Sequence, residues 1–160
     1  MEDFKSVEHK VLNIINKVKQ VEVEKGLKEE EIKYAYTHGM CQDLAMLIKS
    51  QFLDDENVKV LFMRLPYEQI SHQAVVITQD ENQTPKELFD SKGCFYDISG
   101  KTPLYKSGEY LHSFGTSQED NLPYQISLTY IPYNQHFKEN ETTNFVFDQI
   151  NLGVLPELNA

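Results

Sequence analysis

The sequence predicts an α+β domain in which several helices, one of them bearing a cysteine, pack on an antiparallel β-sheet. Apolar residues near the N-terminus recur at steps of three and four, as in an amphipathic helix. Alternating apolar segments with short links follow, and consecutive strands of this kind favour antiparallel pairing. Between the two regions, the break Thr37-His38-Gly39 leads into a helix whose first turn holds Cys41.

Three helices are predicted before the sheet. The first covers residues 6–24, where valines and isoleucines form one stripe, and Gly26 suits its C-terminal cap. The second covers residues 27–36 and begins with three glutamates, which a helix N-terminus favours. The third covers about residues 40–52 and presents Cys41 on its apolar face.

Three strands are predicted next, over residues 58–65, 73–78 and 94–98. Residues 79–86 read as a polar surface loop between the second and third strands. Residues 99–122, rich in Gly, Ser, Pro and Thr, predict either a long loop or a short helix near residues 108–114.

The last part of the chain predicts one further strand, over residues 124–133, which Pro132 stops. An irregular C-terminal part follows. With 160 residues the chain is most simply a single domain. We divide it into N-terminal helices (residues 1–36), a core that carries Cys41 (residues 37–100), and a part that completes the sheet (residues 101–160).

The net charge of −10 argues against a nucleic-acid partner, because phosphate binding needs clustered Lys and Arg. The negative charge either keeps the protein soluble or attracts a basic protein partner. No apolar run of about 18 residues predicts a membrane span. The N-terminus also lacks the apolar region of a signal peptide. We therefore expect a cytoplasmic protein of bacterial or phage origin with two free thiols. The oligomeric state is left open.

Cys41 has the position of an activated nucleophile. A free thiol with a pKa near about 8.5 forms little thiolate at neutral pH. A helix N-terminus stabilises the thiolate through its unpaired N–H groups and its dipole. The same N–H groups can receive the oxyanion that forms when a thiolate attacks a carbonyl. Gly39 permits close approach to this helix end.

His72 and Asp97 can supply the base and its orienting group. His72 is predicted at the accessible start of one strand, and Asp97 lies on the next strand. The alternation of side chains places His72 on the same face of its strand as Ala74, and Asp97 on the same face of its strand as Phe95. If these faces coincide, Asp97 can accept the imidazole N–H and hold the tautomer.

These residues carry a resemblance. Gly39-x-Cys41-x-x-Leu44-Ala45, His72-x-Ala74-Val75-Val76 and Tyr96-Asp97-x-x-Gly100 resemble the core of papain-like and transglutaminase-like cysteine enzymes, in particular small bacterial members.

The resemblance implies a papain-like core and a Cys-His-Asp triad in a cysteine-dependent hydrolase or acyltransferase. Such an enzyme acts on a peptide, isopeptide or amide bond of a peptide or protein substrate. Cys41 would be the nucleophile, His72 the base and Asp97 its orienter. Papain-type enzymes place a Gln before the nucleophile as oxyanion donor, and this segment has none. The oxyanion and substrate site is then expected at His38, Gly39 and Met40. No metal or cofactor is expected.

Other interpretations stay open. Cys41 can be a small core residue, and Cys94 is expected in the core. Cys41, Cys94, His38 and His72 could instead bind zinc, and the two cysteines could form a disulfide. A different class of function is a non-enzymatic acidic binding or inhibitor protein of phage or plasmid origin that keeps this fold. His136 is expected at the surface without an acidic neighbour.

Overall fold

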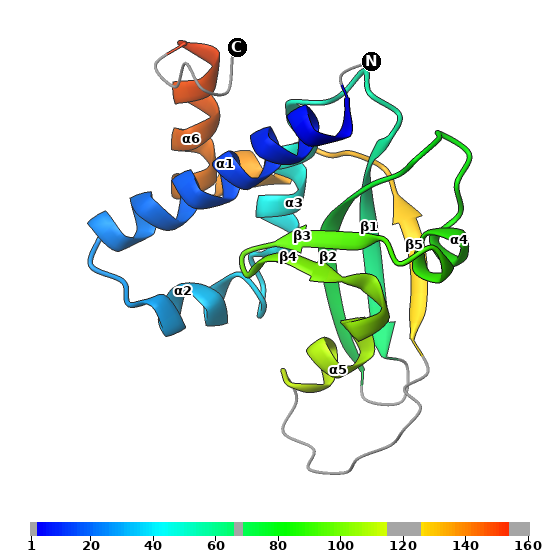
Figure 1. Cartoon of the computed structure of the whole chain (residues 1–160). Helices are drawn as coiled ribbons and strands as arrows, with labels where there is room; N and C mark the ends of the chain where they lie inside the picture. Colours follow the sequence, from blue (N-terminus) through cyan, green and yellow to red (C-terminus); the bar gives the residue numbers. More distant parts are fainter. Residues whose placement is uncertain (1–2, 66–68, 115–125, 154–160) are drawn as a thin grey trace.

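The computed structural model describes residues 3–65, 69–114 and 126–153. Within these residues, six α-helices surround an open antiparallel sheet of five strands, in the order β4-β3-β2-β1-β5 (Figure 1). The helices are α1 (Phe4–Glu24), α2 (Glu29–Ala35), α3 (Cys41–Ser50), α4 (Pro85–Asp90), α5 (Ser107–His112) and α6 (Glu141–Asn151). The strands are β1 (Val58–Leu65), β2 (Ile70–Ile77), β3 (Cys94–Asp97), β4 (Gly100–Pro103) and β5 (Ser127–Ile131). Two short 3-10 helices are η1 (Leu104–Lys106) and η2 (His136–Glu139). The predicted α+β fold class is confirmed.

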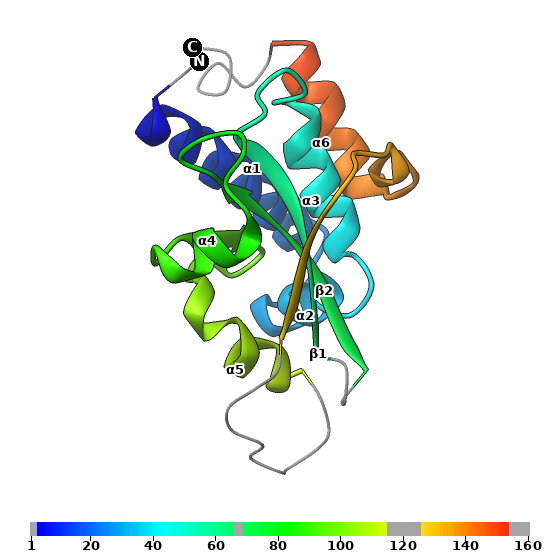
Figure 2. The same cartoon turned by 90° about the vertical axis from the view of Figure 1, so that its right-hand side faces the viewer.

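The two faces of the sheet carry separate hydrophobic cores, because successive strand side chains point to opposite faces. One face, with Val60 and Val75, packs against α1, α3 and α6. The other face, with Ala74, Val76 and Phe95, packs against α4 and α5. Figure 2 shows α3 and α6 on one side of the strands, and α4 and α5 on the other.

The long helix α1 follows the predicted apolar stripe, whose members Val11 and Val18 are fully buried. It begins two residues earlier than predicted because Asp3 caps it, accepting a 2.9 Å hydrogen bond from the Ser6 N–H. No helix in the described part of the chain combines the length and apolar character needed to cross a bilayer.

Helix α3 begins at Cys41 and lies at the centre of the molecule. All residues from Leu44 to Ile48 are buried, so the helix is covered on more than the single face that the sequence predicts. The reason is that α3 packs on β2 with one side and meets η2, α6 and α1 with the others. The predicted packing of this helix on the sheet is confirmed.

Strand β1 has the predicted bounds, but β2 begins at Ile70 and not at residue 73. The two strands pair along their whole length, from Val58 with Ile77 to Leu65 with Ile70. His72 therefore lies inside β2, where it pairs with Met63 and is only 1% exposed. The expected accessible position of His72 at the start of a strand is wrong.

The segment after β2 holds more regular structure than predicted. The end of the expected surface loop enters α4, whose start has a capping box between Thr84 and Glu87 with Pro85 in the first turn. Strand β4 forms a tight hairpin with β3, and its first residue, Gly100, has a φ of 92° that glycine adopts without strain. Helix α5 lies where the alternative short helix was predicted, and residues 115–122 lie outside the described ranges.

The C-terminal part is also more regular than predicted. Strand β5 joins the outer edge of β1, within the predicted strand, whose residues 124–125 lie outside the described ranges. The expected irregular region contains α6, which Asn140 caps by accepting hydrogen bonds from the N–H groups of Thr142 and Thr143. Its residues Val146 and Ile150 are buried in the core beside α1.

Candidate active site

The structure brings His72 and Asp97 together on one face of the sheet. His72 Nε2 lies 2.8 Å from Asp97 Oδ2, and the two side chains are almost fully buried. The predicted coincidence of faces is present, because Ala74, Val76 and Phe95 share one hydrophobic core on that side. The predicted hydrogen bond between the two residues is therefore confirmed.

Cys41 lies close enough to His72 for the two side chains to interact. The thiol interacts with the imidazole, and the nitrogen left for it is Nδ1, because Nε2 faces Asp97. Nδ1 is buried and, among the described residues, makes no hydrogen bond of ordinary geometry. The three side chains therefore follow one another in the order Cys41, His72, Asp97.

Helix α3 packs directly on β2, the strand that carries His72. Strand β2 pairs with β3 only at Val75 and Val76, in the residues that the structure describes. The backbone N–H of Gln73, next to His72 on β2, interacts with the Cys41 thiol. A helix from one face of the sheet thus meets a histidine from the other face.

The local charges favour the thiolate and the imidazolium. Burial alone raises the pKa of Cys41, but the nearby His72 side chain, through its polar interaction and its charge, and the N–H groups of Gln73 and Gln42 lower the pKa below its ordinary value. Burial alone lowers the pKa of His72. The hydrogen bond to Asp97 and the interaction with the nearby Cys41 thiol outweigh burial and raise the pKa of His72 to about 9.

The N-terminus of α3 is open to an anion. Side chains cap α1, α4 and α6, whereas Met40 at the start of α3, like Lys106 at the start of α5, makes no side-chain capping hydrogen bond. The helix begins at Cys41 itself, so the thiol lies in the first turn, where backbone N–H groups lack helical partners. An anion at the sulfur would meet these groups and the positive end of the helix dipole.

Asp97 is held by further donors that the sequence did not indicate. The Tyr110 hydroxyl donates to Asp97 Oδ2 over 2.6 Å, and the Ser99 N–H donates to Asp97 Oδ1 over 2.9 Å. The hydroxyls of Tyr110 and Ser99 lie 2.8 Å apart. Nothing in the sequence indicated Tyr110, because α5 was only an alternative to a loop and its packing on β1 and β2 depends on contacts between distant segments.

Aromatic rings cover the imidazole on the side away from the strand. The Tyr110 and Phe114 ring centroids lie 5.9 Å and 5.5 Å from the His72 ring. The two aromatic rings also contact each other, with centroids 4.8 Å apart. This cover excludes water from His72 and Asp97, and it strengthens the electrostatic interactions between them.

His38, Gly39 and Met40 form the turn before α3 but show little sign of an oxyanion site. His38 stacks on Tyr34, with centroids 4.0 Å apart, and its Nδ1 lies 3.0 Å from the Tyr34 carbonyl oxygen. Its Nε2 lies 3.4 Å from the carbonyl oxygen of Phe114. Both ring nitrogens therefore face backbone oxygens at the rim of the site. The N–H groups of Gln42 and Gln73, which the prediction missed, interact with the Cys41 thiol.

The alternative roles of the cysteines gain no support from the geometry. Both Cys41 and Cys94 are free and half-buried. The described residues hold no group of three or more His, Cys, Asp or Glu side chains arranged to bind a metal ion. The predicted zinc set of His38, Cys41, His72 and Cys94 is therefore not assembled.

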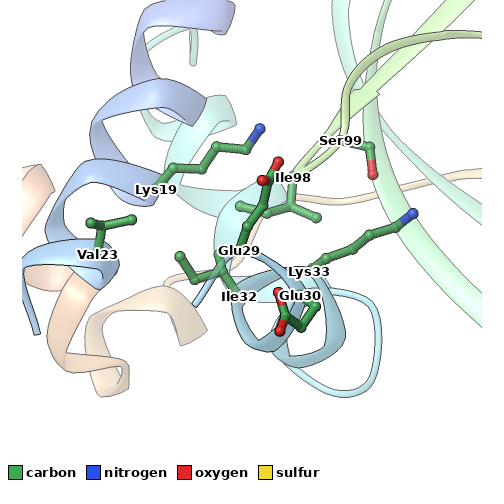
Figure 3. Close-up of a pocket in the computed structure, with 8 residues that line it drawn as sticks. All are labelled: Lys19, Val23, Glu29, Glu30, Ile32, Lys33, Ile98 and Ser99. Atoms are coloured by element: carbon green, nitrogen blue, oxygen red, sulfur yellow. The ribbon is translucent and has the colours of Figure 1, made fainter. Parts of the chain in front are cut away.

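A cavity of about 590 Å³ lies beside these residues, between α1, α2 and the turn that follows β3 (Figure 3). Its lining combines apolar side chains with charges of both signs: Lys19, Val23, Glu29, Glu30, Ile32, Lys33, Ile98 and Ser99. Cys41 does not line it. The cavity adjoins the site through Ser99, on the Asp97 side and away from the thiol.

Comparison with known proteins adds no family. No protein-family model, curated protein or solved structure matches the chain.

Proposed function

We propose that the protein is a cysteine-dependent hydrolase or acyltransferase that acts on a peptide, isopeptide or amide bond. The observation that carries this proposal is the buried His72, which has Asp97 on one ring nitrogen and the Cys41 thiol beside the other. A buried aspartate–histidine pair can be stable without a neighbouring thiol, so the stability of the pair does not explain why Cys41 lies beside it. A thiol with a lowered pKa at an uncapped helix N-terminus is the arrangement that a nucleophile requires.

In the first step, the Cys41 thiolate attacks the carbonyl carbon of the substrate, and the C–N bond breaks as the tetrahedral intermediate collapses. The His72 imidazolium gives its proton to the leaving amine. The product of this step is a thioester on Cys41 and a neutral imidazole.

In the second step, water or an acceptor amine attacks the thioester, and His72 takes the proton of that nucleophile. The carboxylic acid or the new amide leaves, and the thiolate–imidazolium pair is restored. Hydrolysis is favoured over transfer only because water is always present.

Asp97 holds the imidazole so that Nδ1 faces the sulfur, and its negative charge favours the protonated ring. The N–H groups of Gln42 and Gln73 interact with the thiol and are the donors that we assign to the oxyanion. This assignment replaces the predicted oxyanion role of His38. Gly39 and Met40 keep a role in shaping the turn that leads to the nucleophile.

The papain-like core that the resemblance implies is part of this proposal, and the order of elements supports it. A cysteine starts a helix packed on an antiparallel sheet, the histidine lies on β2, and the aspartate lies on β3. We propose that this common arrangement reflects a common chemistry, with the cytoplasm as its compartment and a peptide or protein as its substrate.

A general acyl donor tests the proposal without knowledge of the substrate. The protein is mixed with p-nitrophenyl acetate at pH 7, and the acetylated residue is identified by mass spectrometry. We expect the thioester on Cys41 to form, and to turn over, faster than Cys94 is acetylated. Formation of the Cys41 thioester should require His72. Equal acetylation of both cysteines, unchanged in a His72→Ala variant, would contradict the proposal and favour the acidic binding protein.

A further inference from the structure

We propose that Tyr110 is a positioning residue of this site: its hydroxyl fixes Asp97 so that the carboxylate can orient His72. The inference rests on the proposed function and extends it to a residue on α5, which the sequence motifs do not include. Tyr110 acts through Asp97 and does not touch the reacting sulfur in this account.

The contacts around Asp97 carry the argument. Asp97 Oδ2 accepts from both His72 Nε2, at 2.8 Å, and the Tyr110 hydroxyl, at 2.6 Å. Asp97 Oδ1 accepts from the Ser99 N–H at 2.9 Å. Donors on both oxygens stop the carboxylate from turning about its bond to the chain. Without the Tyr110 hydroxyl, His72 would be the remaining donor to Oδ2. The position of this oxygen would then depend on His72, the residue that Asp97 is meant to orient.

The hydroxyl of Tyr110 is suited to this role because it stays a donor. Burial and the neighbouring Asp97 charge raise the pKa of Tyr110 well above its ordinary value. The Ser99 hydroxyl, 2.8 Å away, gives Tyr110 a second partner. Ser99 also lines the neighbouring cavity, so this end of the network lies near solvent (Figure 3).

The Tyr110 ring has a separate function from its hydroxyl. It packs against Phe95, Phe114 and His72, with centroid distances of 5.4, 4.8 and 5.9 Å. A Tyr110→Phe substitution keeps this packing and removes only the hydroxyl. The substitution therefore separates positioning from the covering of the imidazole.

The experiment measures the rate of Cys41 alkylation by iodoacetamide against pH in the wild type and in Tyr110→Phe. Tyr105→Phe is the matched control, because Tyr105 is 56% exposed and lies in the neighbouring η1. We expect Tyr110→Phe to shift the apparent pKa of the thiol upward and to reduce the rate at pH 7 by roughly three- to tenfold, since part of a hydrogen bond to a charged group is lost. Tyr105→Phe should match the wild type.

The direction of the shift distinguishes two mechanisms. The hydroxyl also withdraws negative charge from Asp97, so its loss alone would strengthen the pull of Asp97 on the imidazolium. Screening of this kind predicts that the apparent pKa of Cys41 falls in Tyr110→Phe, whereas positioning predicts that it rises. A fall, or an unchanged profile, would overturn the proposal.

A His72→Ala variant separates failure of this inference from failure of the proposed function. If His72→Ala raises the apparent pKa of Cys41 and Tyr110→Phe does not, the thiol is activated by His72 and Tyr110 is only structural. If neither variant changes the profile, the activated thiol itself is wrong. A rise of the apparent pKa of Cys41 in both variants supports positioning.

Discussion

Two histidine–aspartate pairs border the two sides of α3, and their geometry is nearly the same. His72 Nε2 lies 2.8 Å from Asp97, and His136 Nδ1 lies 2.9 Å from Asp43. The difference is in the surroundings. The His72 side chain is fully buried, whereas the His136 side chain is 53% exposed. The second nitrogen of His72 faces a thiol, but that of His136 lies 3.5 Å from Glu139.

The comparison teaches that a hydrogen bond between histidine and aspartate does not define a catalytic site. Asp43 also accepts a 3.2 Å hydrogen bond from Asn140, so its pair ties α3 to η2 and to the start of α6. Cys41 and Asp43 are two positions apart in the helix and therefore point in different directions. The first turn of α3 thus carries the thiol on one side and the attachment to η2 and α6 on the other.

The largest difference between the two histidine–aspartate pairs is expected in their contribution to the stability of the folded protein. Asp97→Ala leaves a buried imidazole without its charged partner and should reduce the free energy of unfolding by about 3 kcal/mol. His136→Ala removes an exposed partner, and its effect should be much smaller. Urea unfolding of the two variants at pH 7 measures both. Equal losses would mean that burial does not separate the two pairs.

The next difference is expected in the pH dependence of stability. Asp97 contributes to raising the pKa of His72 to about 9, so folding favours the protonated ring. This stabilisation is complete below the ordinary value of 6.5 and is lost as the pH rises toward about 9.

The difference in unfolding free energy between Cys41→Ser and Cys41→Ser/Asp97→Asn isolates the effect of His72 from that of the thiol. We expect this difference to shrink as the pH rises above 6.5. A difference that stays constant between pH 6.5 and about 9 would show that Asp97 does not stabilise a protonated His72. The Asp43 side chain raises the pKa of His136 in the same direction, but salt should suppress that contribution.

The smallest effect is expected when His136 is changed and the reactivity of the Cys41 thiol is measured. His136→Gln should leave the rate of Cys41 alkylation at pH 7 within about twofold of the wild type, since exposed charges are screened by solvent. Peptide mass spectrometry measures the rate. A tenfold change would mean that the attachment of η2 to α3 also controls the thiol.

The sequence predicted much of the nucleophile region because its signals are local. The stripe of α1, the bounds of β1 and the break before Cys41 depend on spacing and on one glycine. The pairing of His72 with Asp97 followed from the alternation of side chains along neighbouring strands. No property of distant segments was needed for these predictions.

The missed features depend on contacts between distant segments. The burial of His72 follows from full pairing of β1 with β2 and from rings on α5. His136 was expected alone at the surface, but Asp43 lies 93 positions away in the sequence and contacts it. The cap of α4 is the exception, because Thr84, Pro85 and Glu87 form a readable local pattern.

The pH dependence of iodoacetamide labelling at Cys41, resolved from Cys94 by peptide mass spectrometry, tests the central claim most directly. The account predicts that Cys41 reacts with an apparent pKa below that of an ordinary thiol, and that His72→Ala moves this value upward. A Cys41 that stays inert at neutral pH in the folded protein, or that reacts identically in His72→Ala, would contradict the account and leave Cys41 as a core residue.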